Sequence, residues 1–107
     1  MFEYEVRRGI GEQVTILLRG SLLLGTATDL FRACLQTVTD RYASILLDIN
    51  DLKRIDSAGL GELLTAQATA SAHGGVIRLA GATGRVRDVL ILTKLVTVFS
   101  EPATEAA

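Results

Sequence analysis

Two helix-like segments that alternate with short apolar runs constrain this fold most. Residues 26–39 and 58–72 carry apolar side chains at the three- and four-residue spacings of a helix face. Residues 44–49 and 76–80 are short apolar runs, and the first predicts a strand that is buried on both faces. A strand–helix–strand crossover joins parallel strands. We therefore expect a parallel sheet with helices packed on it.

The N-terminal residues add an antiparallel hairpin to this sheet. Charged and apolar side chains alternate over residues 2–8, which predicts a half-exposed strand, and a short turn separates it from a second strand over residues 14–18 that Gly20 ends. The expected fold class is α/β: a small mixed β-sheet made of this hairpin and parallel βαβ units, with helices packed on it.

The remaining segments complete the expected organisation. Residues 50–56 are predicted to be a polar connection and residues 86–95 a third helix. Residues 96–99 are either a short edge strand or irregular. The chain has 107 residues, so we expect a single domain over residues 1–99, followed by a short C-terminal tail over residues 100–107.

Composition excludes several classes of function. The formal net charge is −1, whereas nucleic-acid binding proteins usually carry an excess of basic residues. No nucleic acid is therefore expected as a partner. The single Cys34 excludes an internal disulfide framework and a multi-cysteine zinc site, and it favours a reducing compartment. No apolar run approaches the roughly 18–20 residues of a membrane span, and the N-terminus does not resemble a signal peptide. We expect a cytoplasmic protein with no membrane insertion and no cofactor.

The segment around Ser57 is the richest candidate site. Sites in parallel sheets gather where the carboxyl ends of strands lead into helices, and Ser57 falls at such a point. Ser57 is either a helix cap, whose hydroxyl accepts a backbone N–H, or a site of modification. Gly59 and Gly61 each cost the helix about 1 kcal/mol relative to alanine, so a neighbouring element or a partner is expected to approach the backbone closely.

A phosphoryl group on Ser57 has a physical logic. It would meet the exposed N–H groups and the positive end of the helix, so the fold would tolerate it. A partner packed over the same loop would have to desolvate about two added negative charges. Phosphorylation can therefore break a contact there without refolding the domain.

The same residues resemble a known family. Ile45-Leu46-Leu47-Asp48, followed by Ile55-Asp56-Ser57-Ala58-Gly59-Leu60-Gly61, resembles the signature of STAS domains, and the bacterial anti-sigma factor antagonists most of all. The resemblance implies the STAS fold and a non-enzymatic, partner-switching role. The unmodified antagonist binds an anti-sigma factor that has serine kinase activity. Phosphorylation of the serine in the motif releases the complex, and a phosphatase restores the serine.

Carried onto this chain, the resemblance assigns Ser57 as the phosphate acceptor and Asp56 as a residue that shapes the acceptor loop. The expected partner-binding residues are Asp56, Ser57, Ala58, Gly59, Leu60, Gly61, Leu23, Leu24, Lys53 and Arg54. Lys53 and Arg54 are either a solvated surface or a basic flank that steers an acidic partner.

Two residues depart from the family pattern. Leu23 stands where many antagonists carry an aspartate, which makes the loop apolar: either an enlarged contact surface or a buried segment. Ala58 removes a second hydroxyl beside Ser57, which leaves Ser57 as the only acceptor in the motif. Leu23 also supports an alternative function, a non-switching STAS subunit of a larger assembly such as a stress-sensing or transporter-associated complex. The sequence does not identify the sigma factor, the kinase, the signal or the oligomeric state.

Other reactive side chains give weaker hypotheses. His73 is the only histidine, and a hydrolase would need it beside Ser57. If one helix carries both, about 24 Å of helix separates them at about 1.5 Å per residue. We therefore expect His73 near the end of the helix and Cys34 in the core.

Overall fold

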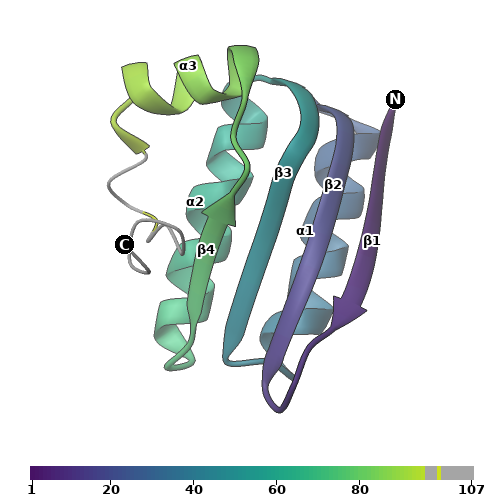
Figure 1. The fold of residues 1–107 in the computed structure, drawn as a ribbon, viewed down its shortest axis with the longest axis vertical. Helices are drawn as coiled ribbons and strands as arrows, with labels where there is room; N and C mark the ends of the chain where they lie inside the picture. The colour runs from purple at the N-terminus through teal and green to yellow at the C-terminus, as the bar shows by residue number, and fades with distance from the viewer. Residues whose placement is uncertain (96–98, 100–107) are drawn as a thin grey trace.

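The strands lie in the sheet in the same order as in the sequence. In the computed structural model, which describes residues 1–95 and Phe99, the order is β1 (Phe2–Arg8), β2 (Gln13–Leu22), β3 (Ser44–Ile55) and β4 (Val76–Ala80), as Figure 1 shows. β1 pairs antiparallel with β2, whereas β2 with β3 and β3 with β4 are parallel. This arrangement confirms the predicted mixed α/β sheet.

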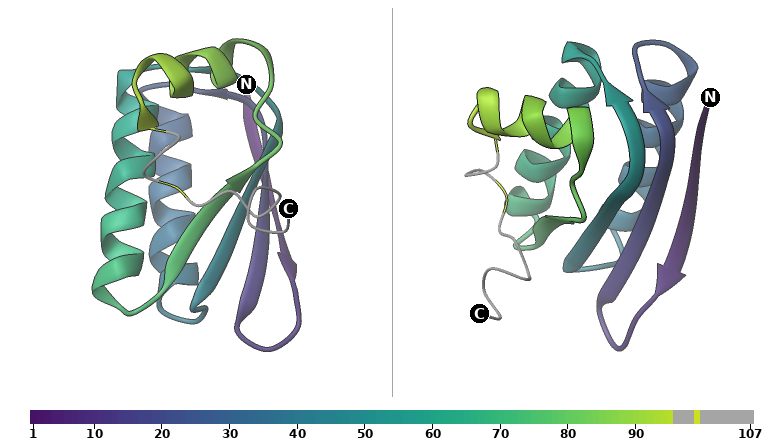
Figure 2. Two further views of the ribbon diagram at one scale, coloured as in Figure 1. Left: turned by 60° about the vertical axis from the view of Figure 1, so that its left-hand side comes forward. Right: turned by 45° about the horizontal axis from the view of Figure 1, so that its top comes forward.

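Helices α1 (Thr26–Thr39) and α2 (Ser57–Ala72) lie on the same face of the sheet, and α3 (Gly84–Leu92) crosses its end (Figure 2). Successive crossovers of one hand that step across a sheet in one direction place their helices on one face. The prediction that residues 44–49 are buried on both faces was therefore wrong. Leu47 is fully buried under the helices, but Leu46 and Asp48, on the other face, are only half-buried.

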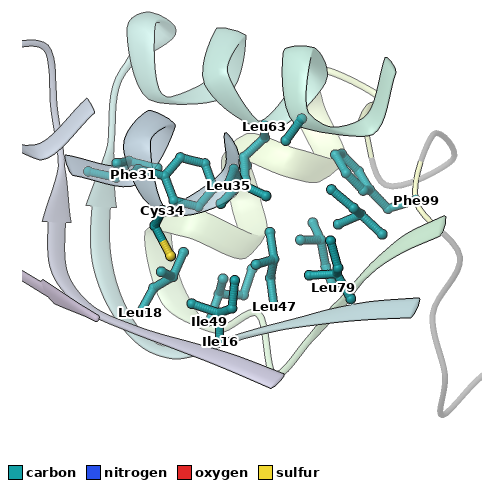
Figure 3. Packing of buried hydrophobic residues seen from close by; sticks show 14 of the residues in the cluster. Ile16, Leu18, Phe31, Cys34, Leu35, Leu47, Ile49, Leu63, Leu79 and Phe99 are labelled. Atoms are coloured by element: carbon teal, nitrogen blue, oxygen red, sulfur yellow. The ribbon is translucent and has the colours of Figure 1, made fainter. Parts of the chain in front are cut away.

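The core forms between the helices and the covered face of the sheet, where alternate strand residues meet the apolar helix faces (Figure 3). Ile16, Leu47 and Leu79 come from three neighbouring strands, and Phe31 from α1 packs above them. Phe99 also joins this core and is buried. A residue beyond α3 therefore contributes to the packing of the sheet.

β2 continues past the glycine that was expected to end it. Gly20 has a φ of 91°, and a Cβ at this position would collide with the carbonyl oxygen of Met1. Glycine here permits a close approach between β1 and β2 rather than a turn. The strand therefore extends to Leu22 and carries the chain to the candidate site.

β3 is longer than expected, because its second half is a strand and not the polar connection predicted over residues 50–56. Its pairing with β2 shifts register twice, and at each shift β3 has one more residue than β2. These bulges interrupt the in–out alternation, so Leu52 is buried but is followed by two exposed residues. The polar residues within 50–55, which do not alternate with apolar ones, therefore belong to a bulged strand and not to a loop.

The helix ends differ by a few residues from the prediction. α2 begins at Ser57 and ends before Gly74, which adopts a φ of 77° as a helix stop. The third helix covers Gly84–Leu92 instead of residues 86–95. The expectation for residues 96–99 falls mostly outside the described residues, since only Phe99 is described there, and it is not in a strand. The predicted tail over residues 100–107 also lies outside them.

Candidate functional site

Asp56 joins the two loops that form the candidate site. Its Oδ1 accepts a hydrogen bond from the backbone N–H of Gly59 at 2.8 Å, and its Oδ2 accepts one from the backbone N–H of Leu24 at 2.9 Å. The first bond caps α2, and the second holds the loop between β2 and α1 against it. These backbone donors, that of Leu24 first, lower the pKa of the Asp56 carboxyl below its usual value. The carboxylate therefore stays ionised and braces the site.

Ser57 is the first residue of α2 and is exposed. It is not the cap of the helix, because Asp56 holds that position with its own side chain. The structure thus overturns the interpretation of Ser57 as a helix cap. Its hydroxyl makes no cap hydrogen bond and lies at the positive end of a helix of 16 residues.

Packing within the chain explains why residue 59 of the motif is a glycine. It is buried, and a Cβ there would collide with the carbonyl oxygen of Leu22 and lie 2.8 Å from Cγ1 of Ile55. The backbone of α2 can approach the end of β2 only if this residue has no side chain. The element that approaches Gly59 therefore belongs to this chain.

Gly61 differs from Gly59, although it stands only two residues later. It is exposed, and nothing lies within 4 Å of the position that its Cβ would occupy. Packing within the described chain therefore gives no reason for a glycine here. Its flanking residues differ too: Leu60 is half-buried against the core, and Ala58 is half-buried.

Exposure increases along three successive leucines, from the last residue of β2 into the loop that follows it. Leu22 is fully buried, Leu23 is half-buried, and Leu24 is 79% exposed. An open depression of about 270 Å³ lies beside these residues. The residues that line it are Met1, Phe2, Ser21, Leu23, Leu24, Thr26, Ala27 and Leu30. The sequence left open whether this segment is buried or forms an enlarged contact surface. Leu22 is buried, whereas Leu24 is exposed and available for contact.

Sequence reasoning missed Leu30 and Met1 as parts of this surface. Leu30 fits the apolar helical spacing of residues 26–39, but it is 42% exposed, whereas Phe31 faces the core. The sequence did contain a signal, because two adjacent helical residues point about 100° apart. Leu30 and Phe31 therefore cannot both point directly into the core. The placement of Met1 depends on the pairing of β1, since its carbonyl accepts the N–H of Ser21 at 2.7 Å.

Lys53 and Arg54 lie near the end of β3, close to the candidate site. Both are exposed and follow the buried Leu52, because the second bulge lies between the partners of Leu52 and Arg54. Arg54 lies opposite Ser21, which also lines the apolar depression. The pairing of β2 and β3 therefore places a basic residue beside the exposed loop.

The weaker candidates lie away from this site. His73 caps the far end of α2, and its Nδ1 lies 2.8 Å from the carbonyl oxygen of Thr69, so the structure separates it from Ser57 by the whole helix. Cys34 is buried in the core, where desolvation raises the pKa of its thiol to about 11. The expected positions of both residues are confirmed.

A comparison with protein families identifies the family of this chain. The family model described as "Mlab, STAS domain" matches residues 7–99. The chain belongs to the STAS domain family. No curated protein matches it.

None of the helices within the described residues is long and apolar enough to cross a membrane.

Solved structures with the same STAS fold include anti-sigma factor antagonists. TM1081 of Thermotoga maritima is 25% identical with a TM-score of 0.79, over 98% of this chain and 90% of that one. The phosphorylated form of SpoIIAA from Bacillus is 23% identical with a TM-score of 0.74, over 92% and 90% of the two chains. A sulfate transporter family protein of Wolinella succinogenes is 17% identical with a TM-score of 0.69, over 80% and 70%. The resemblance to STAS anti-sigma factor antagonists is thus confirmed.

Proposed function

We propose that this STAS domain is a cytoplasmic, non-enzymatic anti-sigma factor antagonist that is switched at Ser57. It binds an anti-sigma factor with serine kinase activity, and phosphorylation of Ser57 releases it. The observation that supports this most is the exposed hydroxyl of Ser57 directly beside Asp56, whose carboxylate joins α2 to the loop that contains Leu24. The modifiable group and the exposed apolar loop therefore share one braced surface.

Addition of a phosphoryl group changes the surface more than the fold. The hydroxyl of Ser57 caps nothing, so its modification breaks no hydrogen bond of α2. The phosphate adds about two negative charges at a helix N-terminus, where the partial positive charge accommodates them. A partner seated over Leu24 and Gly61 would have to desolvate these charges. Because the fold accommodates the phosphate and the interface does not, phosphorylation releases the partner without unfolding the domain.

The partner surface combines an apolar part with a basic one. Leu24 and Leu30 provide exposed apolar area, and Gly61 leaves room for close approach to the backbone of α2. Lys53 and Arg54 flank this area. An anti-sigma factor with an apolar contact bordered by acidic residues would fit it, because opposite charges speed and orient the encounter.

The decisive measurement is intact mass after incubation with Mg-ATP and each candidate anti-sigma kinase, together with capture of the complex. We expect wild type to gain one phosphoryl group and to lose the complex. Ser57→Ala should gain none and stay bound. Ser71→Ala is the matched control, since Ser71 is also exposed on α2 but near its other end. Phosphorylation of Ser57→Ala, or a phosphorylated wild type that stays bound, would contradict the proposal. A phosphatase of the pathway should then reverse the modification.

A second role is supported by Leu23, the residue that replaces the expected aspartate. In a non-switching STAS subunit of a larger assembly, the apolar loop would be a permanent contact. The fold is shared with a sulfate transporter family protein, which supports a setting of this kind. Stable binding to a kinase without modification, with phosphorylation gained by Leu23→Asp, would indicate a constitutive antagonist. Absence of both binding and modification with every candidate kinase would favour this second role.

A further inference from the structure

The outer edge of β1 offers a regular strand with free backbone groups. Within the described residues β1 pairs only with β2, in an unbroken register over all seven of its residues. The backbone N–H of Ser21 bonds to Met1, and that of Gly9 to Gln13, so the odd-numbered residues bond to β2. The N–H and C=O groups of Phe2, Tyr4, Val6 and Arg8 therefore point away from the sheet.

Apolar side chains at this edge are exposed. Tyr4 is 40% exposed and Val6 is 42% exposed, and both face a groove of about 330 Å³ between β1 and α1. Edge strands are protected from association by a bulge, a proline or charged side chains. β1 has no bulge and no proline, and the charges that it carries are of both signs. An edge with these features can add a further strand.

The charges of β1 identify the strand that fits. Its acidic residues, Glu3 and Glu5, come first, and its basic residues, Arg7 and Arg8, come last. A strand that pairs antiparallel with it and complements these charges must also begin acidic and end basic along its own direction. The same strand of a second copy meets this requirement.

We propose that two copies of this chain dimerise through β1, in an antiparallel register centred on Glu5. Tyr4 then lies opposite Val6 of the second copy, and their outward N–H and C=O groups exchange hydrogen bonds. Glu3 lies opposite Arg7 of the second copy on the other face. The two sheets join into one continuous sheet around a two-fold axis.

The two Glu5 side chains meet at this axis, and each already forms ion pairs with two arginines of its own chain. Glu5 Oε2 lies 2.7 Å from Nε of Arg7, and Oε1 lies 3.1 Å from Nη2 of Arg19. With Glu3 of the second copy added, the face carries alternating acidic and basic groups. The dimer proposal does not rest on the role of Ser57, because its axis lies at the middle of β1. The last pair of this register, Phe2 with Arg8 of the second copy, borders the depression that Phe2 helps to line.

Charge reversal tests the register. We expect sedimentation velocity to show a concentration-dependent dimer for wild type. Glu3→Arg and Arg7→Glu each place like charges opposite one another twice, and each should weaken association by about tenfold or more. In an equimolar mixture, the introduced arginine of one variant faces the introduced glutamate of the other, so mixing should restore the dimer. A wild type that stays monomeric at all concentrations, or a mixture that stays dissociated, would overturn the proposal.

Disulfide capture provides a measurement that does not depend on charge. Only Glu5 faces its own copy, so Glu5→Cys should crosslink under mild oxidation and Glu3→Cys should not. The native Cys34 remains in both variants and is unreactive, because it is buried. Equal crosslinking of the two variants, or crosslinking of Val6→Cys in place of Glu5→Cys, would refute this register.

Discussion

Gly59 and Gly61 stand two residues apart in one motif but have opposite surroundings. Gly59→Ala forces a methyl group against the carbonyl oxygen of Leu22 and should destabilise the fold by about 1–3 kcal/mol. Gly61→Ala adds a methyl group in open space and should stabilise α2 by about 0.5–1 kcal/mol. Urea unfolding of both variants measures the difference. Equal effects on stability would contradict the packing described for Gly59. Loss of partner binding in Gly61→Ala despite higher stability would support a contact there.

Asp56 also acts at the scale of a single side chain, and its effect depends on pH. Its pKa is lowered in the folded state, mainly by the N–H of Leu24, so its ionised form stabilises the fold above the unfolded pKa. This stabilisation is lost as the pH falls through the lowered, folded pKa. Asp56→Asn should therefore be less stable than wild type at neutral pH, and the difference should shrink on acidification. Chemical unfolding at several pH values measures it, and a difference that grows toward acid would contradict this account.

At the scale of elements, a substitution in the second half of β3 tests whether these polar residues form a packed strand. Leu52 is fully buried between two bulges, so Leu52→Ala should cost about 2–5 kcal/mol. Lys53→Ala is the control, because its side chain is exposed and its removal should change stability by less than about 0.5 kcal/mol. Thermal and urea unfolding compare the two. A small effect of Leu52→Ala would instead fit a loop over residues 50–56.

At the scale of the whole molecule, Phe99 tests where the folded unit ends. Its side chain is buried in the core, so Phe99→Ala should cost about 3–5 kcal/mol. We propose that the domain covers residues 1–99, as expected from the sequence. Deletion of residues 100–107 should then leave the free energy of unfolding and the melting temperature unchanged. A marked loss of stability on deletion would place the boundary further along the chain.

The sequence by itself determined the order and type of the elements. Periodicity is a local property, so the helix over 26–39, the strand over 76–80 and the hairpin could be predicted from neighbouring residues. The motif around Ser57 and its family could also be found in this way. These features depend on residues that are close together in the chain.

Only the tertiary structure decided how the site is braced. Asp56 bonds to Leu24 across 32 residues, and Gly59 packs on Leu22, so neither contact follows from local spacing. The bulges in β3 depend on its pairing with β2, and the face of the sheet that each helix covers depends on both crossovers. The exposed edge of β1 likewise exists only because of the order of the strands. Contacts between distant segments decide these features, because the free energy of packing depends on the assembled fold.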